Sequence, residues 1–147
     1  MSFVFNEAKR AFAEGEIDLG ADDIRCILVD TTTTFDVDDD IDTLAGVTTA
    51  GYYDGANHDV TNGHALSGEV VNEDAGNNRA EFDATDLVFS ALGVGSAQAQ
   101  AILVFKWITN LGLSLPIAYI DTGGFPFDGN GGDVTFQWNA EGILQVT

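Results

Sequence analysis

The sequence predicts a mainly β domain, an antiparallel β-sandwich or barrel with one short helix near its N-terminal end. Short runs of β-branched and aromatic residues recur along the second half of the chain, and clusters of Gly, Asn and Asp separate them. No second segment has a helical period long enough for a βαβ crossover. With 147 residues, of which 45% are apolar, we expect one domain spanning residues 1–147.

A short amphipathic helix is expected within residues 2–14, unless this segment extends as an arm. Apolar residues recur there at helical spacing: Val4, Ala8 and Phe12. Asn6 is a candidate N-cap and Gly15 a candidate stop.

The first long strand is expected at residues 24–30, the apolar run IRCILVD, which acidic residues bound on both sides. Cys26, the only cysteine, lies inside this run and is therefore predicted to be a small core residue. Residues 31–64 are predicted to be mostly connection, with Asn62-Gly63 as the strongest hairpin signal. A small apolar group within them favours a helical turn or a packed loop: Ile41, Leu44 and Val47.

The remaining strands are expected between clusters of turn residues, at residues 69–72, 79–92, 98–108, 116–121 and 133–146. Apolar and polar residues alternate at Ala80, Phe82 and Ala84, which is typical of a half-buried strand. Pro116 and Pro126 lie where a strand begins or a loop turns. Short spacing between strands favours antiparallel pairing.

The chain is strongly acidic: 5 Lys and Arg against 24 Asp and Glu give a net charge of −19. Such a surface repels phosphate backbones and anionic lipids, so we expect neither nucleic acid nor membranes as partners. The N-terminal residues lack signal-peptide features, and a soluble protein made in the cytoplasm is expected. The charge fits three explanations: dispersal of an abundant protein, docking onto a basic patch, or adaptation to salt.

The stretch FDVDDDIDTL, residues 35–44, holds a cluster of aspartates that are candidate metal ligands. Asp36, Asp38 and Asp40 occupy the first three ligand positions of an EF-hand loop. The sixth position is Ile41 where glycine is needed, and the twelfth is Val47 where a glutamate is needed. We therefore predict a solvated loop without a metal, and these three aspartates remain weak candidates.

No motif in the chain predicts an enzyme or a cofactor. Asp83, Asp86 and Asp121 are the candidate acids, and each is equally well explained as a strand-end residue facing water. His58 and His64 match no ligand spacing and are predicted to be surface loop residues. Serine-nucleophile and phosphate-loop motifs are absent from the sequence.

Aromatic residues are the candidate contacts for a partner. Four lie in predicted loops and three in the N-terminal segment: Tyr52, Tyr53, Phe125, Phe127, Phe3, Phe5 and Phe12. The loop aromatics have a competing explanation, in which their rings cover the ends of strands as lids on the sandwich.

Several segments together resemble a family of small structural proteins of tailed bacteriophages. The matching parts are a K…G.ID segment (residues 9–18), a strand ending LVD (28–30), an FDATD strand (82–86) and a final DVTFQWNAEGI strand (133–143). The resemblance implies a non-enzymatic virion protein, favouring a head decoration or cement protein on the capsid surface. It would bind the major capsid protein and copies of itself as a small oligomer, with a trimer as one form.

Two other functions stay open from the sequence. A tail tube, tail terminator or fibre-associated protein would use a similar β-sandwich. A calcium- or carbohydrate-binding module is motivated by the aspartate cluster and the loop aromatics.

Overall fold

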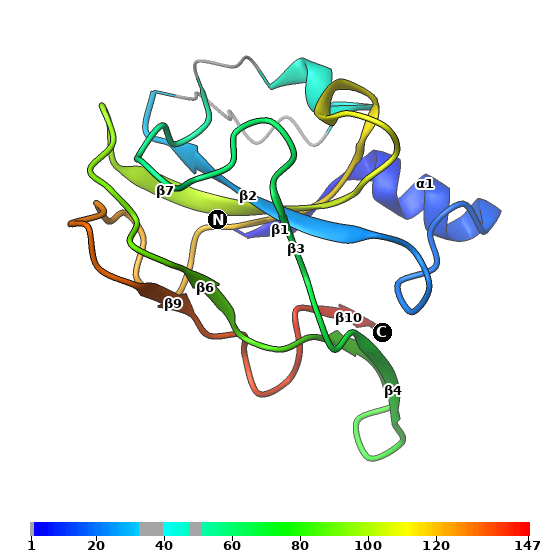
Figure 1. Ribbon diagram of the computed structural model, residues 1–147. Helices are drawn as coiled ribbons and strands as arrows, with labels where there is room; N and C mark the ends of the chain where they lie inside the picture. The colour runs from blue at the N-terminus through cyan, green and yellow to red at the C-terminus, as the bar shows by residue number, and fades with distance from the viewer. Residues whose placement is uncertain (1, 33–39, 48–50) are drawn as a thin grey trace.

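The computed structural model describes residues 2–32, 40–47 and 51–147, and it confirms a mainly β fold with antiparallel sheets (Figure 1). One α-helix, α1 (Asn6–Glu14), lies near the N-terminal end of the described chain. The strands are β1 (Phe3–Val4), β2 (Ile24–Asp30), β3 (His64–Ala65), β4 (Val70–Asp74), β5 (Arg79–Asp83), β6 (Leu87–Phe89), β7 (Ala99–Lys106), β8 (Leu115–Ile120), β9 (Val134–Phe136) and β10 (Leu144–Val146). Two 3₁₀ turns complete the described elements, η1 (Leu44–Gly46) and η3 (Leu111–Leu113).

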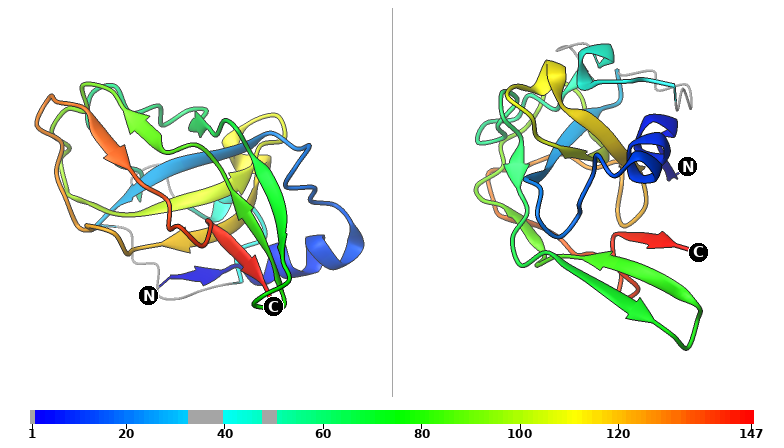
Figure 2. Two further views of the ribbon diagram at one scale, coloured as in Figure 1. Left: turned by 90° about the horizontal axis from the view of Figure 1, so that it is seen from below. Right: turned by 90° about the vertical axis from the view of Figure 1, so that its right-hand side faces the viewer.

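The strands form two layers. The first layer is a five-stranded sheet in the order β1-β8-β7-β2-β3. The second layer consists of two smaller sheets, β10-β5-β4 and β6-β9, which lie end to end (Figures 1 and 2). The arrangement is therefore sandwich-like, as the sequence predicts.

Strands β2 and β7 form the centre of the first layer, in an antiparallel register that runs from Ile24 opposite Lys106 to Asp30 opposite Ala99. Every residue from Cys26 to Val29 is fully buried. A strand that is covered on both faces carries an uninterrupted apolar run, which is why IRCILVD is recognisable in the sequence. The predicted boundaries of this strand, 24–30, are confirmed, and so is the core position of Cys26.

The N-terminal segment is part strand and part helix. Val4 pairs with Ala118 in β8, and the Phe5 backbone N–H donates to the Ile117 carbonyl oxygen at 3.0 Å, so the segment is extended up to Phe5. Helix α1 then begins at Asn6 with Phe5 as its N-cap, and it ends before Gly15 as predicted. The predicted capping by Asn6 and the helical position of Val4 are therefore wrong, because pairing with β8 holds Val4 in a strand.

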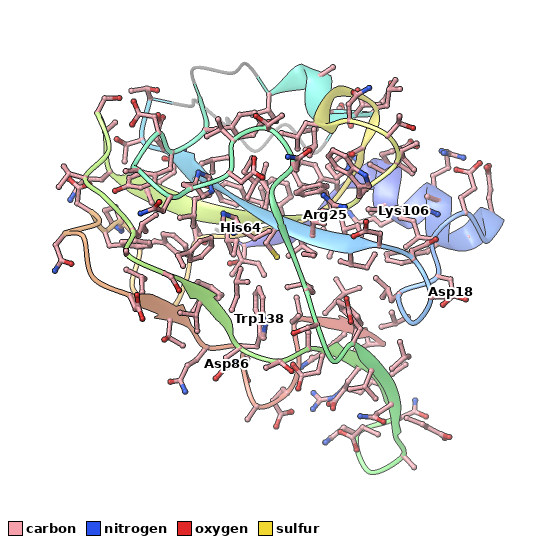
Figure 3. The ribbon with its side chains drawn as sticks, viewed as in Figure 1. Asp18, Arg25, His64, Asp86, Lys106 and Trp138 are labelled. Carbon is pink, nitrogen blue, oxygen red and sulfur yellow. The ribbon has the colours of Figure 1, made fainter. Side chains whose placement is uncertain are left out.

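Two of the predicted strands, 79–92 and 133–146, are each broken into two. The breaks lie opposite one another, where the Trp138 backbone N–H donates to the Asp86 carboxylate at 3.1 Å. The Trp138 indole N–H donates to the Thr85 carbonyl oxygen, also at 3.1 Å. These contacts hold β6 and β9 in line with β5 and β10, so the second layer stays continuous across the breaks (Figure 3).

In residues 51–65 the structure differs from the prediction at one turn. Asn62-Gly63 does not close a hairpin, because β3 pairs directly with β2, far away in sequence. Instead the Gly63 N–H donates to the Asp59 carbonyl oxygen at 3.1 Å and closes a loop turn. The expected apolar turn is present: η1 buries Leu44, and Val47 is buried beside it.

Candidate functional site

The predicted aromatic contacts fall into two groups. Phe5 and Tyr53 are fully buried and Tyr52 is 5% exposed, so these rings belong to the core of the chain itself. As the chain is folded they have no surface to offer a partner, which corrects the prediction for these three residues. The other four are partly buried against the core, and contact with a partner remains a prediction for them: Phe3, Phe12, Phe125 and Phe127.

Tyr53 joins three glycine-containing segments that are far apart in sequence. Its hydroxyl accepts hydrogen bonds from the backbone N–H of Gly129 at 2.7 Å and of Gly95 at 3.0 Å. The same hydroxyl oxygen lies 2.7 Å from the Gly93 carbonyl oxygen and 2.8 Å from the Asp128 carboxylate, which are the two acceptors within reach of its single proton. The DGNGGD turn and the VGSAQ loop are therefore parts of one structural cluster around a tyrosine.

His58 is buried and His64 is half-buried, so the prediction of two surface histidines is wrong. The His58 side chain is 8% exposed, and its ring stacks on that of His64 with 5.2 Å between centroids. The Phe89 ring packs against both histidines. The apolar neighbour comes from β6, distant in sequence, which is why the local Gly- and Asn-rich context gave no sign of burial.

The hydrogen bonds of His58 define its protonation state. The Leu28 backbone N–H donates to Nε2 at 3.0 Å, and Nδ1 lies 2.6 Å from the Tyr53 carbonyl oxygen. Because Nε2 accepts, Nδ1 must carry the single proton and donate it to that oxygen. Burial lowers the pKa of His58 to about 4, against the opposing hydrogen bond to Tyr53.

We expect acid to destabilise the fold through His58. The neutral ring is favoured in the folded state, so its contribution is complete above the unfolded pKa of 6.5 and is lost as pH falls toward the folded pKa of about 4. The groups that face the ring are His64, whose pKa burial also lowers, and Asp59, whose carboxylate attracts a proton to either ring. From pH 7 to 4.5 the unfolding free energy should fall by about 2 kcal/mol through this residue.

Urea unfolding at both pH values, compared between the wild type and His58→Gln, measures this contribution. The glutamine amide keeps an acceptor for the Leu28 N–H and does not titrate, so it isolates the imidazole from the many carboxylates of the chain. An equal drop in both proteins would contradict the assignment.

The candidate metal ligands and acids do not assemble into a catalytic or metal centre in the described part of the chain. Asp36 and Asp38 lie outside the described residues, while Asp40 is exposed and accepts a hydrogen bond from the Asn6 side-chain amide at 3.0 Å. The residues described contain no group of three or more His, Cys, Asp or Glu arranged to hold a metal ion. The Asp86 carboxylate accepts a hydrogen bond from the Trp138 backbone N–H, and the Asp121 carboxylate accepts one from the Ser2 hydroxyl at 3.0 Å.

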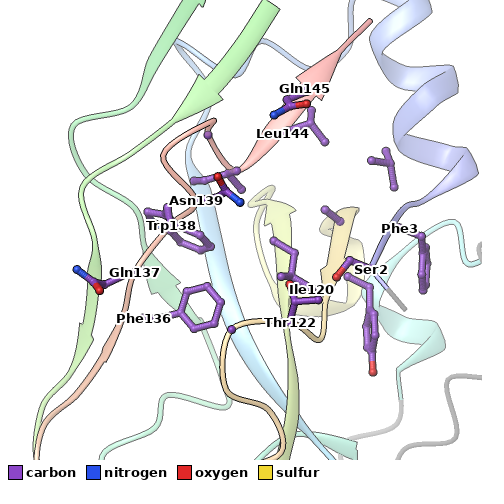
Figure 4. A pocket seen from close by; sticks show the side chains of 16 residues that line it. Ser2, Phe3, Ile120, Thr122, Phe136, Gln137, Trp138, Asn139, Leu144 and Gln145 are labelled. Carbon is purple, nitrogen blue, oxygen red and sulfur yellow. The ribbon is translucent and has the colours of Figure 1, made fainter.

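A cleft of about 540 Å³ between the two layers was not predicted from the sequence (Figure 4). Its lining comes from β1, β8, the loop after β8, and the stretch from β9 to β10: Ser2, Phe3, Val4, Ala118, Tyr119, Ile120, Thr122, Gly123, Phe136, Gln137, Trp138, Asn139, Gly142, Ile143, Leu144 and Gln145. None of these lining residues is charged, although 20% of the chain is. We take this cleft as the candidate binding site.

The cleft has one apolar wall from each layer. Val4 and Ala118 are paired, so their side chains share a face of the first layer, and Ile120 lies on the same face two residues along β8. Across the cleft stand Trp138 and Leu144 of the second layer (Figure 4). Amide and hydroxyl side chains complete the lining and supply polar groups: Ser2, Thr122, Gln137, Asn139 and Gln145.

Outside the cleft, carboxylates dominate the charged side chains. Within the described part of the chain, four of the five cationic residues form ion pairs with acidic residues, and Arg25 and Lys106 are examples (Figure 3). The pairs are Arg10 with Glu7, Glu14 and Glu16, Arg25 with Asp23, Arg79 with Asp74, Glu81 and Glu141, and Lys106 with Asp22. Little positive charge is left to balance the remaining acids, so the negative field extends over the surface around an uncharged cleft.

Comparison with models of known protein families, with curated proteins and with solved structures finds no match to this chain. The likeness to phage structural proteins therefore rests on the sequence segments alone. In the described residues, no helix has the length and apolar character needed to span a bilayer.

Proposed function

We propose that this chain is a virion structural protein of a tailed bacteriophage, and that it decorates the head shell by binding the major capsid protein. The observation that carries the proposal is the excess of 24 acidic over 5 basic residues on a small β-sandwich whose arginines are already engaged in internal ion pairs. A net charge of −19 steers such a protein toward a basic surface and keeps its free copies apart before assembly.

Several residues that carry the family resemblance contribute to packing and hydrogen bonding in this fold. Phe82 of the FDATD segment is buried, and Asp86 at its end holds Trp138. In the DVTFQWNAEGI segment, Phe136 packs edge-on against Trp138 with 4.9 Å between ring centroids. Two of the four segments that carry the resemblance thus help to build the second layer, which is consistent with a protein that works by presenting surfaces rather than by catalysis.

The proposed mechanism is stabilisation by mass action. A protein that binds the assembled shell and not its dissociated subunits shifts the equilibrium toward the intact shell. Small oligomers, including the trimer that the resemblance suggests, would increase the lifetime of each docked unit, because several contacts then have to open together.

Binding to purified shells of the major capsid protein tests the proposal. We expect saturation at hundreds of copies per particle, and we expect the association rate to fall at least tenfold when salt rises from about 50 to 500 mM, because ions screen the steering field. A dozen copies or fewer per particle would favour a ring in the tail and overturn the head position. No binding to either heads or tails would overturn the virion function altogether.

A further inference from the structure

We propose that the cleft is a β-augmentation site, in which an extended segment of a partner protein lies beside β10 and completes the second layer. The inference deepens the proposed assembly function, on which it rests for the source of the partner, by naming the kind of segment that binds. Peptide strands that add to an open sheet edge gain affinity from main-chain hydrogen bonds and specificity from the pockets under alternate side chains.

The space for a strand follows from the unequal widths of the layers. The first layer extends through β8 to β1, whereas the second layer ends at β9 and β10. Val4 and Ile120 on one wall, and Trp138 and Ile143 on the other, are each only partly buried. A strand bound in this cleft would cover apolar side chains from both layers. It would also widen the second layer by one strand beside β10.

The open edge of β10 lacks the usual protection against pairing. Among the described strands, β10 is paired with β5 on one side only, and none of its three residues is charged. β4, the opposite edge of the same sheet, carries Glu73 and Asp74 and follows Glu69. Natural proteins place charges on sheet edges that must stay unpaired, so the uncharged edge of a strongly acidic chain indicates an edge that is meant to be covered.

Charge decides which kind of segment fits. The incoming strand needs apolar residues at every second position to reach the cleft, and uncharged residues between them. Basic residues at its ends would meet the surrounding negative field, whereas acidic residues would be repelled. A second copy of this chain brings another net charge of −19, so we assign the segment to a different, neutral or basic protein.

The test attaches a model strand to the full chain. The sequence KTVTVTK is linked to Thr147 by a flexible Gly/Ser linker, and the control carries KPVPVPK on the same linker, since proline cannot join a ladder. We expect the alternating strand, and not the control, to slow amide hydrogen exchange in β10 at least tenfold. It should also shift the fluorescence of Trp138 to shorter wavelength, with the spectrum of a Trp138→Phe variant identifying the contribution of Trp107.

A matched pair of substitutions locates the contact. Val146→Lys places a charge on the open edge, and Val71→Lys makes the same change on the same face at the opposite edge; the two valines are 59% and 51% exposed. Val146→Lys should abolish the added protection and Val71→Lys should leave it. Equal behaviour of the two extensions, or of the two lysine variants, overturns the proposal.

Two further measurements separate this inference from the proposed function. Sedimentation of the unextended chain reports self-association, and a dimer that Val146→Lys dissociates would make the occupant a second copy, against our assignment. In the shell-binding assay, Val146→Lys should weaken binding at least tenfold relative to Val71→Lys. Unchanged binding by Val146→Lys would refute the role of the edge in assembly while the virion function stands.

Discussion

Replacing Gly129 by alanine is expected to lower the free energy of unfolding by about 3 kcal/mol, because the new methyl group has no space. A Cβ atom at this position would lie 2.2 Å from the Gly93 carbonyl oxygen and 2.5 Å from the Leu92 carbonyl oxygen. Both obstacles are backbone atoms, which cannot move aside as a flexible side chain would. The loop after Phe127 would have to leave its place beside residues 92–93.

Gly20→Ala is the matched control for this substitution. The nearest atom to a Cβ at Gly20 is the Asp18 carboxylate oxygen at 3.6 Å, an ordinary contact. We expect this variant to stay within about 0.5 kcal/mol of the wild type. Urea unfolding followed by tryptophan fluorescence compares the two, and similar midpoints for both variants would contradict the close packing at Gly129.

The parts of the fold that the sequence predicts well are those decided by local pattern. The buried strand at residues 24–30 is bounded by acids and has no polar interruption, so its ends are visible in the sequence. The stop of α1 at Gly15 is likewise a local signal. Contacts between residues far apart in sequence decide the other parts of the fold. Trp138 forms hydrogen bonds to Thr85 and Asp86, and the two strands predicted as continuous are broken where these residues meet.

The candidate site could not be predicted because its walls come from separate parts of the chain. Val4, Ile120 and Trp138 meet only after the two layers have formed, and none belongs to a motif. One signal was available: the stretch Val134–Asn139 and the C-terminal residues 142–147 are free of charge in a chain with 24 acidic residues. In such a chain, long uncharged strands at predicted sheet edges deserve testing as binding edges.

The contacts among the glycine-rich segments around Tyr53 could not be predicted either, because these segments are far apart in the sequence. From the sequence, GYYDG, VGSAQ and DGNGGD are three separate loops, and Tyr53 is a candidate contact residue. The fold brings these segments around one phenol ring, where a Cβ at Gly95 would lie 2.5 Å from the ring. Gly55 and Gly95 are therefore explained by the volume of the Tyr53 ring and not by turn geometry alone.

Tyr53→Phe is expected to cost about 3 kcal/mol of unfolding free energy, although it removes a single oxygen atom. The phenylalanine ring keeps the packing, but the N–H groups of Gly95 and Gly129 lose their common acceptor. Gly129 is buried, so water cannot replace the lost bond there, whereas Gly95 keeps a longer contact of 3.2 Å to Asp128. An unsatisfied buried donor costs about 1 to 3 kcal/mol, and the loss of the bond that the single hydroxyl proton makes, to Gly93 or Asp128, adds to it.

The neighbouring Tyr52→Phe is the control, since both tyrosines are buried and both variants keep a ring. To the described residues, the Tyr52 hydroxyl makes one hydrogen bond, to the Leu44 carbonyl oxygen at 3.3 Å, so its removal should cost only about 1 kcal/mol. Urea midpoints of the two variants give the difference directly. If Tyr52→Phe lowered the unfolding free energy as much as Tyr53→Phe, the hydrogen bonds of the Tyr53 hydroxyl would not be what stabilises the contact between the three glycine segments. Packing of the ring would then have to account for their position in the sandwich.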